Sequence, residues 1–174
     1  MDAATGTTLV EQAASGDDVA FARLIAEHHE PMVRAAYVVV GDVDLAREAA
    51  QNAWAVAWKR LASLRQPERI RSWLVAISAN EARQLVRRAK RRQIVEISDR
   101  PPEPSSDAAD WIDLVDLEHA LAKLKPDERS LLALRYVSGL DSTDIAEQLG
   151  LTASGVRSRL SRLVDRLRKD LDDV

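Results

Sequence analysis

The sequence predicts an all-α protein made of two small helical domains that a flexible acidic linker joins. Apolar residues recur at three-and-four spacing along most of the 174-residue chain, and no convincing alternating strand pattern interrupts them. Helix-forming residues dominate, whereas aromatic residues make up 4%. A stretch at 93–113, rich in proline, serine and acidic residues, is too polar to fold alone. We therefore expect a loosely ordered N-terminus at 1–16, helical domains at 17–92 and 114–174, and the linker between them.

The composition and charge distribution of the chain exclude several classes of function. The net charge is -3, so the whole chain is not a basic nucleic-acid coat, but the charge is uneven. Residues 17–97 hold 14 basic and 10 acidic side chains, and residues 98–113 hold one basic and five acidic. The chain has no cysteine and shows no phosphate loop, nucleophile with a base, or metal cluster. We expect no enzymatic activity, cofactor, metal or small-molecule substrate.

The sequence also shows neither the pattern of a membrane span nor that of a secretory signal. No apolar run approaches the roughly 20 residues that a membrane span needs. The first residues lack the basic and apolar segments of a secretory signal. We therefore expect no membrane insertion and a cytoplasmic location.

The N-terminal segment and the first long helix come next. Leu9 and Val10 are expected to pack in a short helix, and Asp17 or Asp18 to cap the long one. Pro31 lies inside the helical pattern and should kink or divide it. Two adjacent histidines follow the first apolar residues, but they point to different faces and lack the spacing of a metal site. A packed or solvated pair is the better interpretation. The apolar pattern of this helix is Phe21, Leu24, Ile25, His28 and Met32.

Residues 43–61 form the next expected helix, whose apolar positions are mostly alanine. Trp54 and Trp58 are four apart, so they share one face and are expected to be core. A compact polar patch occupies the opposite side. Such a patch is either ordinary solvated surface or a docking site for another protein, and the pattern does not separate the two. Its members are Arg47, Glu48, Gln51 and Asn52.

A loop at 62–69 leads into a long helix from about Pro67 to Arg92, with Asn80, Arg83 and Arg87 on one face. From Arg65 to Arg92 nine basic residues face two acidic ones. Positive charge at a helix C-terminus favours the macrodipole. Five positive charges in the last six residues exceed that need, so contact with a phosphate backbone is favoured.

The second domain begins with leucines at helical spacing, and then the chain turns. Pro126 suits the first position of a further helix, which Ser138-Gly139 closes. The segment 141–169 then has the pattern of a helix-turn-helix. Ser142 or Thr143 is expected to cap its first helix, Gly150 to end it, and Thr152 to cap its second helix. The leucines of the opening segment are Leu114, Leu117, Leu121 and Leu124.

The second helix of that motif carries two distinct faces. Val156, Leu160, Leu163 and Leu167 share the core side. The outer side has short hydroxyls and arginines, which suit a helix lying deep in a major groove. A solvated amphipathic helix is the alternative, but the capped turn and the six basic residues against one acidic from 157–169 favour DNA contact. The outer residues are Ser154, Arg157, Ser158 and Ser161, with Arg162 at the flank.

Taken together, these motifs resemble bacterial RNA polymerase sigma factors of the extracytoplasmic-function class, minimal members of the sigma-70 family. The resemblance covers about residues 17–169. In the C-terminal half it is carried by Ala120-Leu121, Leu124, Arg129, Leu134-Arg135-Tyr136, Gly139-Leu140, Asp144-Ile145-Ala146, Leu149-Gly150, Gly155-Val156 and Ser158-Arg159-Leu160. In the N-terminal half it is carried by Phe21, Ala46, Gln51, Trp58, Trp73-Leu74, Ile77, Asn80 and Arg87-Arg88.

The resemblance implies three residue sets and several partners. Core RNA polymerase would bind the polymerase set, Arg47, Glu48, Gln51 and Asn52. The minus-10 promoter element would be opened and held by the minus-10 set, Ser63, Arg65, Arg71, Asn80, Arg83, Arg87 and Arg88. The minus-35 element would be read by the minus-35 set, Ser154, Arg157, Ser158, Arg159, Ser161 and Arg162. The linker would thread the RNA exit path, and an anti-sigma factor would cover both domains.

The chain departs from the family pattern at a few positions. Glu48-Ala49-Ala50-Gln51 replaces the common Asp-Leu-Val-Gln, and Gln84 stands where an aspartate is common. Two other functions fit the same residues. One is a stand-alone helix-turn-helix regulator, and the other is a degenerate sigma factor that acts only through an anti-sigma partner. A second nucleic-acid surface at 65–92 favours the sigma factor over the regulator, because a regulator needs only one.

Overall fold

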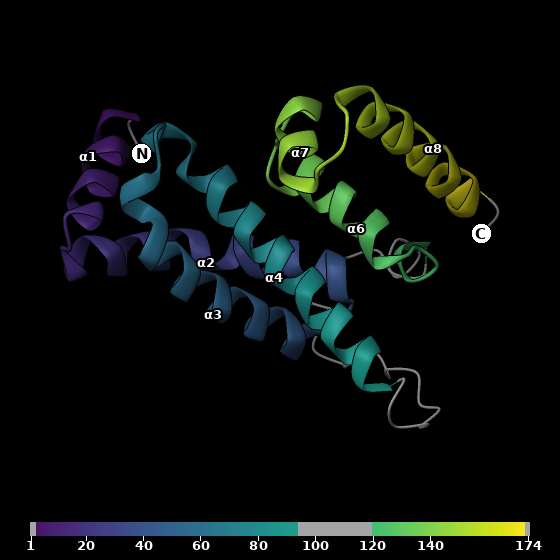
Figure 1. The fold of residues 1–174 in the computed structure, drawn as a ribbon, viewed down its shortest axis with the longest axis horizontal. Coiled ribbons are helices and arrows are strands. Elements are labelled where there is room, and N and C mark those ends of the chain that lie inside the picture. The colour runs from purple at the N-terminus through teal and green to yellow at the C-terminus, as the bar shows by residue number, and fades with distance from the viewer. Residues whose placement is uncertain (1–2, 94–119, 173–174) are drawn as a thin grey trace.

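The computed structural model describes residues 3–93 and 120–172, and within them every regular element is helical (Figure 1). This confirms the predicted all-α class. The linker prediction at 94–113, together with Leu114 and Leu117, lies outside the described residues. The elements of the N-terminal domain are α1 (Ala3–Ala14), α2 (Asp18–Val40), α3 (Val43–Arg60), η1 (Leu61–Ser63), η2 (Pro67–Arg69) and α4 (Ile70–Gln93). Those of the C-terminal domain are α6 (Pro126–Leu132), η4 (Ala133–Val137), α7 (Ser142–Leu149) and α8 (Ala153–Asp172).

Carboxylate caps fix where the helices of the N-terminal domain begin. The Asp17 carboxylate accepts from the backbone N–H groups of Val19 and Ala20, at 2.8 and 3.0 Å, as the sequence predicts. Asp42 caps α3 in the same way through the N–H of Leu45, at 2.9 Å. These bonds satisfy donors that the first turn of a helix leaves free.

Alanine side chains make most of the buried contacts of helix α3. The side chains on its inner face are fully buried between α2 and α4, so the three helix backbones approach one another closely. Ala49 and Ala50, the departure from the family pattern, belong to this inner face and are 0% exposed. The departure therefore lies in the buried core of α3 and not on its exposed polar patch. The buried alanines are Ala46, Ala49, Ala50, Ala53 and Ala57.

Three features of the N-terminal domain differ from the sequence prediction. Helix α1 covers residues 3–14, so it is longer than the short helix expected around Leu9 and Val10 in an otherwise loosely ordered segment, and both residues are buried. Pro31 does not divide its helix, because α2 runs through it from Asp18 to Val40. Trp54 is buried as predicted, but Trp58 is 44% exposed, and each ring meets Phe21 edge-on.

The helix-turn-helix of the C-terminal domain forms as predicted, with one change of cap. Asp141, one residue before the expected Ser142, accepts from the backbone N–H groups of Thr143 and Asp144. These two bonds lower the pKa of the Asp141 carboxyl. Gly150 ends α7 in the left-handed conformation, at φ 65°, and the Thr152 hydroxyl accepts from the N–H of Gly155 at 3.1 Å. Capping hydrogen bonds therefore fix where each of the two helices of the motif begins.

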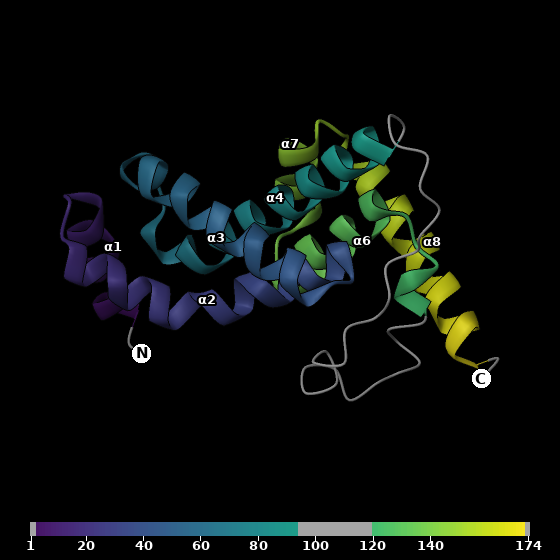
Figure 2. The same ribbon diagram turned by 90° about the horizontal axis from the view of Figure 1, so that it is seen from below.

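The two domains pack against each other. Helices α2 and α4 of the N-terminal domain contact α6 and η4 of the C-terminal domain, and α8 lies on the far side of α6 (Figures 1 and 2). Buried residues from both domains, among them Leu74, Val75, Leu131 and Leu134, belong to one continuous apolar core. The arrangement brings the start of α4 close to α7.

Candidate nucleic-acid interface

The outer face of α8 is the first candidate surface. Val156, Leu160 and Leu163 are buried on the inner side, as the spacing predicts, and the whole minus-35 set is exposed. Thr152 Oγ1 lies 2.9 Å from where a Cβ on Gly155 would sit, so glycine at this position leaves room for the cap. The recognition face therefore rests on a fixed helix start.

The members of the minus-35 set are not equivalent. Arg162 Nε donates to the backbone carbonyl of Ser158 at 3.2 Å, whereas Arg157 and Arg159 have no ion-pair or hydrogen-bond partner among the described residues. At about 100° per residue, Arg159 lies on the flank of the helix, more than 100° from the centre of the outer face. The other five residues of the minus-35 set share the outer face of α8, which has the serine hydroxyls at its centre. On that face, Arg157 is the arginine whose guanidinium has no partner among the described residues.

The second candidate surface follows one side of α4. Arg83 donates to Asn80 Oδ1 at 3.0 Å, and Arg88 donates to Gln84 Oε1 at 3.3 Å. Arg83 is half-buried, and its Nε has no hydrogen-bond partner. Burial, followed by the neighbouring charge of Arg87, lowers the pKa of Arg83. The exposed side chains of Asn80 and Arg88 are open to a base edge or a phosphate, whereas the buried Nε of Arg83 is out of reach of both in this structure.

The minus-10 set does not form one surface. Ser63 donates to the carbonyl of Arg60 at 2.6 Å, and Arg65 is exposed in the loop before α4. Arg71 lies on the other side of α4, close enough to α2 to help lower the pKa of His28, a shift whose larger cause is burial. Asn80, Arg83 and Arg87 therefore share a face that Arg71 does not.

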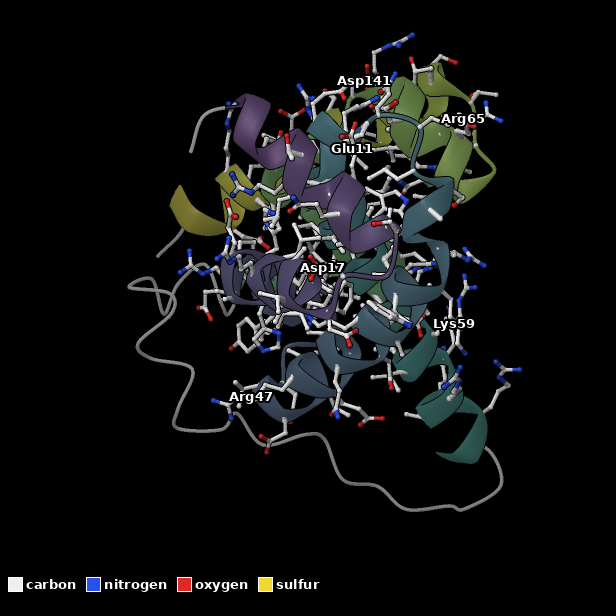
Figure 3. All side chains as sticks on the ribbon, turned by 90° about the vertical axis from the view of Figure 1, so that its left-hand side faces the viewer. Glu11, Asp17, Arg47, Lys59, Arg65 and Asp141 are labelled. Atoms are coloured by element: carbon white, nitrogen blue, oxygen red, sulfur yellow. The ribbon has the colours of Figure 1, made fainter. Side chains whose placement is uncertain are left out.

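Two cavities lie where the α4 face meets the C-terminal domain. One, of about 340 Å³, has Asn80 and Arg83 of α4 on one side and Ser130 and Leu134 on the other. The second, of about 390 Å³, lies between the loop with Arg65 and helix α7. Arg65 and Asp141 lie at the same end of the molecule although they belong to different domains (Figure 3). No pattern in the sequence predicts that these two segments lie close together, because they are far apart in the chain.

The third candidate surface is the polar side of α3. Arg47, Glu48 and Gln51 are exposed, Asn52 is half-buried, and Arg47 pairs with Asp44 at 3.5 Å. Arg47 and Gln51 line a groove of about 630 Å³ between α3 and α2, while Glu48 and Asn52 lie outside it.

The α2 wall of this groove was missed from the sequence. It is formed by Ile25, His29, Glu30 and Val33. His29 Nδ1 accepts from Trp54 Nε1 at 3.2 Å, which ties α2 to α3 at the floor. The one sequence pattern that could have indicated this wall is the spacing of His29, Glu30 and Val33, which places them on one side of α2. That spacing is common on helix surfaces and does not identify a binding site.

Within 3–93 and 120–172 no group of three histidine or acidic side chains is arranged to hold a metal ion. No helix in the same ranges is long and apolar enough to cross a membrane.

Comparison with known proteins gives two family matches and several relatives. Residues 24–92 match the model of Sigma-70 region 2, and residues 114–167 match that of Sigma-70, region 4. A probable RNA polymerase sigma factor, RfaY of Xanthomonas campestris, is 33% identical over 91% of this chain, which spans 42% of RfaY. The sigma factor CnrH of Cupriavidus metallidurans is 28% identical over 94% of this chain and 93% of its own length. The extracytoplasmic-function sigma factor SigL of Mycobacterium tuberculosis is 27% identical over 95% and 96%.

A solved structure supports the same relationship. CnrH in complex with the cytosolic domain of CnrY matches with a TM-score of 0.66 at 27% identity, covering 99% of both chains. The sigma factor RpoE of Bartonella quintana, solved with the anti-sigma factor NepR, shares the fold, with a TM-score of 0.69 at 24% identity.

Proposed function

The chain belongs to the sigma-70 family as a sigma factor of the extracytoplasmic-function class, and on that premise we propose how its surfaces divide the work. Helix α8 reads the minus-35 element in the major groove through the minus-35 set. The α4 face with Asn80, Arg83 and Arg87 holds the opened minus-10 strand. The exposed part of α3 docks on core RNA polymerase. The single observation that carries the proposal is the presence of two separate basic surfaces, one on a capped helix-turn-helix and one on α4.

The chemistry of each surface suits its role. Small hydroxyl residues around Arg157 let a helix approach the base edges, and a free guanidinium can reach a guanine with two hydrogen bonds. The basic end of α4 suits a single strand, whose phosphates need a positive channel. A regulator that bound duplex DNA alone would need only the first surface.

The proposal extends to partners and place. CnrH was solved with the cytosolic domain of CnrY, and RpoE with the anti-sigma factor NepR. We propose that an anti-sigma factor also binds this chain. Sigma factors are DNA-binding regulators without catalysis, and we propose that this chain has no enzymatic activity and no cofactor. It would act in the cytoplasm, where core polymerase and the chromosome meet.

The test is run-off transcription with core polymerase, with and without this protein, on a pool of promoter fragments. We expect transcripts from a discrete subset that shares two sequence elements. Core binding without transcripts would indicate a degenerate sigma factor. Tight binding to duplex DNA without any association with core polymerase would indicate a stand-alone regulator.

A further inference from the structure

A short turn folds helix α1 back onto the N-terminal domain. Gly16 adopts the left-handed conformation at φ 98°, and its N–H donates to the carbonyl of Ala13 at 3.1 Å, which ends α1. Asp17, the next residue, caps the start of α2. Because one helix ends and the next begins at adjacent residues, and α1 also contacts α2, the position of α1 on the domain is fixed.

The apolar face of α1 lies on the connection between α3 and α4. Helix α1 contacts both η1 and η2, as well as α2 (Figure 1). Leu9, Val10 and Ala13 are 8%, 2% and 3% exposed. They belong to the same apolar core as Leu61 and Ile70, which lie at the two ends of the connection. Helix α1 therefore covers the inner side of the loop segment 61–69, which comprises η1, η2 and the residues between them.

The loop segment 61–69 turns an apolar side chain inward at every third residue. Leu61 and Ile70 are buried, while Leu64 and Pro67 are half-buried, and this spacing matches the three residues per turn of a 3₁₀ helix. Its backbone is held by single-turn bonds, such as that from the Leu64 N–H to the Leu61 carbonyl at 3.0 Å. Such bonds have poor geometry, so they do not fix a loop by themselves. The shape of the segment therefore depends on the side chains packed against its inner side.

The outward residues of the segment include two members of the minus-10 set. Ser63 and Arg65 are exposed, and they stand on either side of Leu64, whose side chain packs against the core. A displacement of Leu64 would therefore move both of them. A loop that is already ordered loses little conformational freedom when it binds a ligand. Contacts on the inner side of the segment can thus favour strand binding without touching the strand.

We propose that α1 is a positioning element of the minus-10 site. Leu9 and Val10 hold the loop segment 61–69 in the shape that presents Ser63 and Arg65 to the opened strand. Neither of the two α1 side chains contacts DNA, because both are buried in the protein. The inference rests on the proposed function of the minus-10 set, and it extends the site from the α4 face to the loop before it.

The variants are chosen to weaken this contact and to control for lost stability. Val10→Ala removes two methyl groups from the contact, and Leu9→Ala is the larger truncation. Leu9→Met keeps the apolar volume. Val43→Ala is the matched control, because it removes the same groups from a valine that is 3% exposed at the start of α3, the end of that helix away from the loop. Urea unfolding of each variant measures the stability that it loses.

Two measurements separate the order of the loop from the binding of DNA. The first is amide hydrogen exchange in residues 61–69 of the free full chain. The second is binding of the full chain in complex with core polymerase to a fluorescent single-stranded DNA, with core polymerase alone as background. This DNA carries the minus-10 sequence that the transcription experiment identifies. A duplex carrying the minus-35 element reports on the other domain.

We expect Val10→Ala and Leu9→Ala to speed exchange in residues 61–69 and to weaken strand binding by roughly fivefold or more, with duplex binding unchanged within about twofold. Leu9→Met and Val43→Ala should bind the strand as the natural chain does. Should Leu9→Ala prevent folding, Val10→Ala, the smaller change, decides the question.

Three results would overturn the positioning role. They are unchanged exchange in residues 61–69, natural strand binding by the α1 variants, and an equal loss of strand binding in Val43→Ala, which would show a general effect of stability. A different result would overturn the proposed role of the minus-10 set, namely that the natural chain with core polymerase holds the strand no better than core polymerase alone. The exchange measurement would still decide whether α1 orders the loop.

Discussion

At the scale of single residues, the two basic surfaces differ in how far their side chains are already engaged. Arg162 is tied to the backbone of Ser158, and Arg83 to Asn80, whereas Arg157 has no partner in the described part of the chain. A guanidinium that is bonded to the protein is held in one orientation and has fewer of its five N–H donors left for DNA, whereas a free one keeps all five. Arg157 is thus the residue of α8 best prepared to read a base.

Replacing Arg157 with alanine should weaken promoter binding and relax the preference at one position of the minus-35 element. A bidentate contact to a base contributes about 1–3 kcal/mol of discrimination. The measurement is binding to a set of duplexes that differ at single minus-35 positions. Arg23→Ala, which removes one exposed positive charge far from α8, is the control. An equal loss on every duplex would mean that Arg157 contacts only phosphate.

Replacing Asn80 with alanine should slow opening of the minus-10 element more than it weakens the closed promoter complex. The change removes the acceptor of Arg83 and one partner for a displaced base, and one hydrogen bond is worth about 1 kcal/mol, or roughly fivefold. Opening can be followed by permanganate reactivity of unpaired thymines, with Gln12→Ala, which removes an exposed amide on α1, as control. A loss confined to closed-complex binding would contradict the assignment.

At the scale of elements, local signals predicted most helix ends, and tertiary packing decided the exceptions. Gly150 and Thr152 were predicted because their bonds lie within a few residues of each other. Asp141 was missed because three successive residues can all cap, and the sequence does not choose among them. Helix α2 passes through Pro31 since Met32 and Val33, at 0% and 1% exposed, are held by neighbouring helices that outweigh the lost backbone bond.

Replacing Gly150 with alanine should destabilise the C-terminal domain by about 1 kcal/mol, because a side chain is disfavoured in the left-handed region. Nothing lies within 4 Å of the added Cβ, so the cost is in the backbone and not in a clash. Gly150→Asn should recover part of the stability, as asparagine tolerates this conformation. Urea unfolding of the two variants beside the natural chain measures it, and equal stability of all three would show that the turn adjusts.

At the scale of the whole molecule, the sequence supported the two domains but not their contact. The surfaces that meet are built from residues such as Arg69 and Asp144, which are 75 positions apart. In each domain alone these residues have the pattern of solvated charges at helix ends. Apolar spacing and capping residues are patterns within one helix, so the sequence can indicate them. A contact between residues on either side of a linker has no such repeating pattern. Three-dimensional information was therefore needed to reveal that the two domains meet.

Removing one interdomain ion pair should shift the protein from the form in which the two domains are in contact, the closed form, towards a form in which they are apart. Asp144→Asn keeps the size of the side chain and removes the charge that faces Arg69, and exposed pairs of this kind shift an equilibrium by roughly two- to fivefold. Cysteines introduced as Ser72→Cys and Gln148→Cys would both line the cavity between α4 and α7, in a chain that has no cysteine of its own. The rate at which a short bis-maleimide crosslinker joins them reports the closed fraction. Asp165→Asn, an exposed change in the same domain with the same loss of charge, should leave that rate unaltered. Because the apolar contacts of Leu131 and Leu134 remain, the closed form should be weakened and not abolished, and an equal effect of both substitutions would show that net charge, and not the pair, sets the balance.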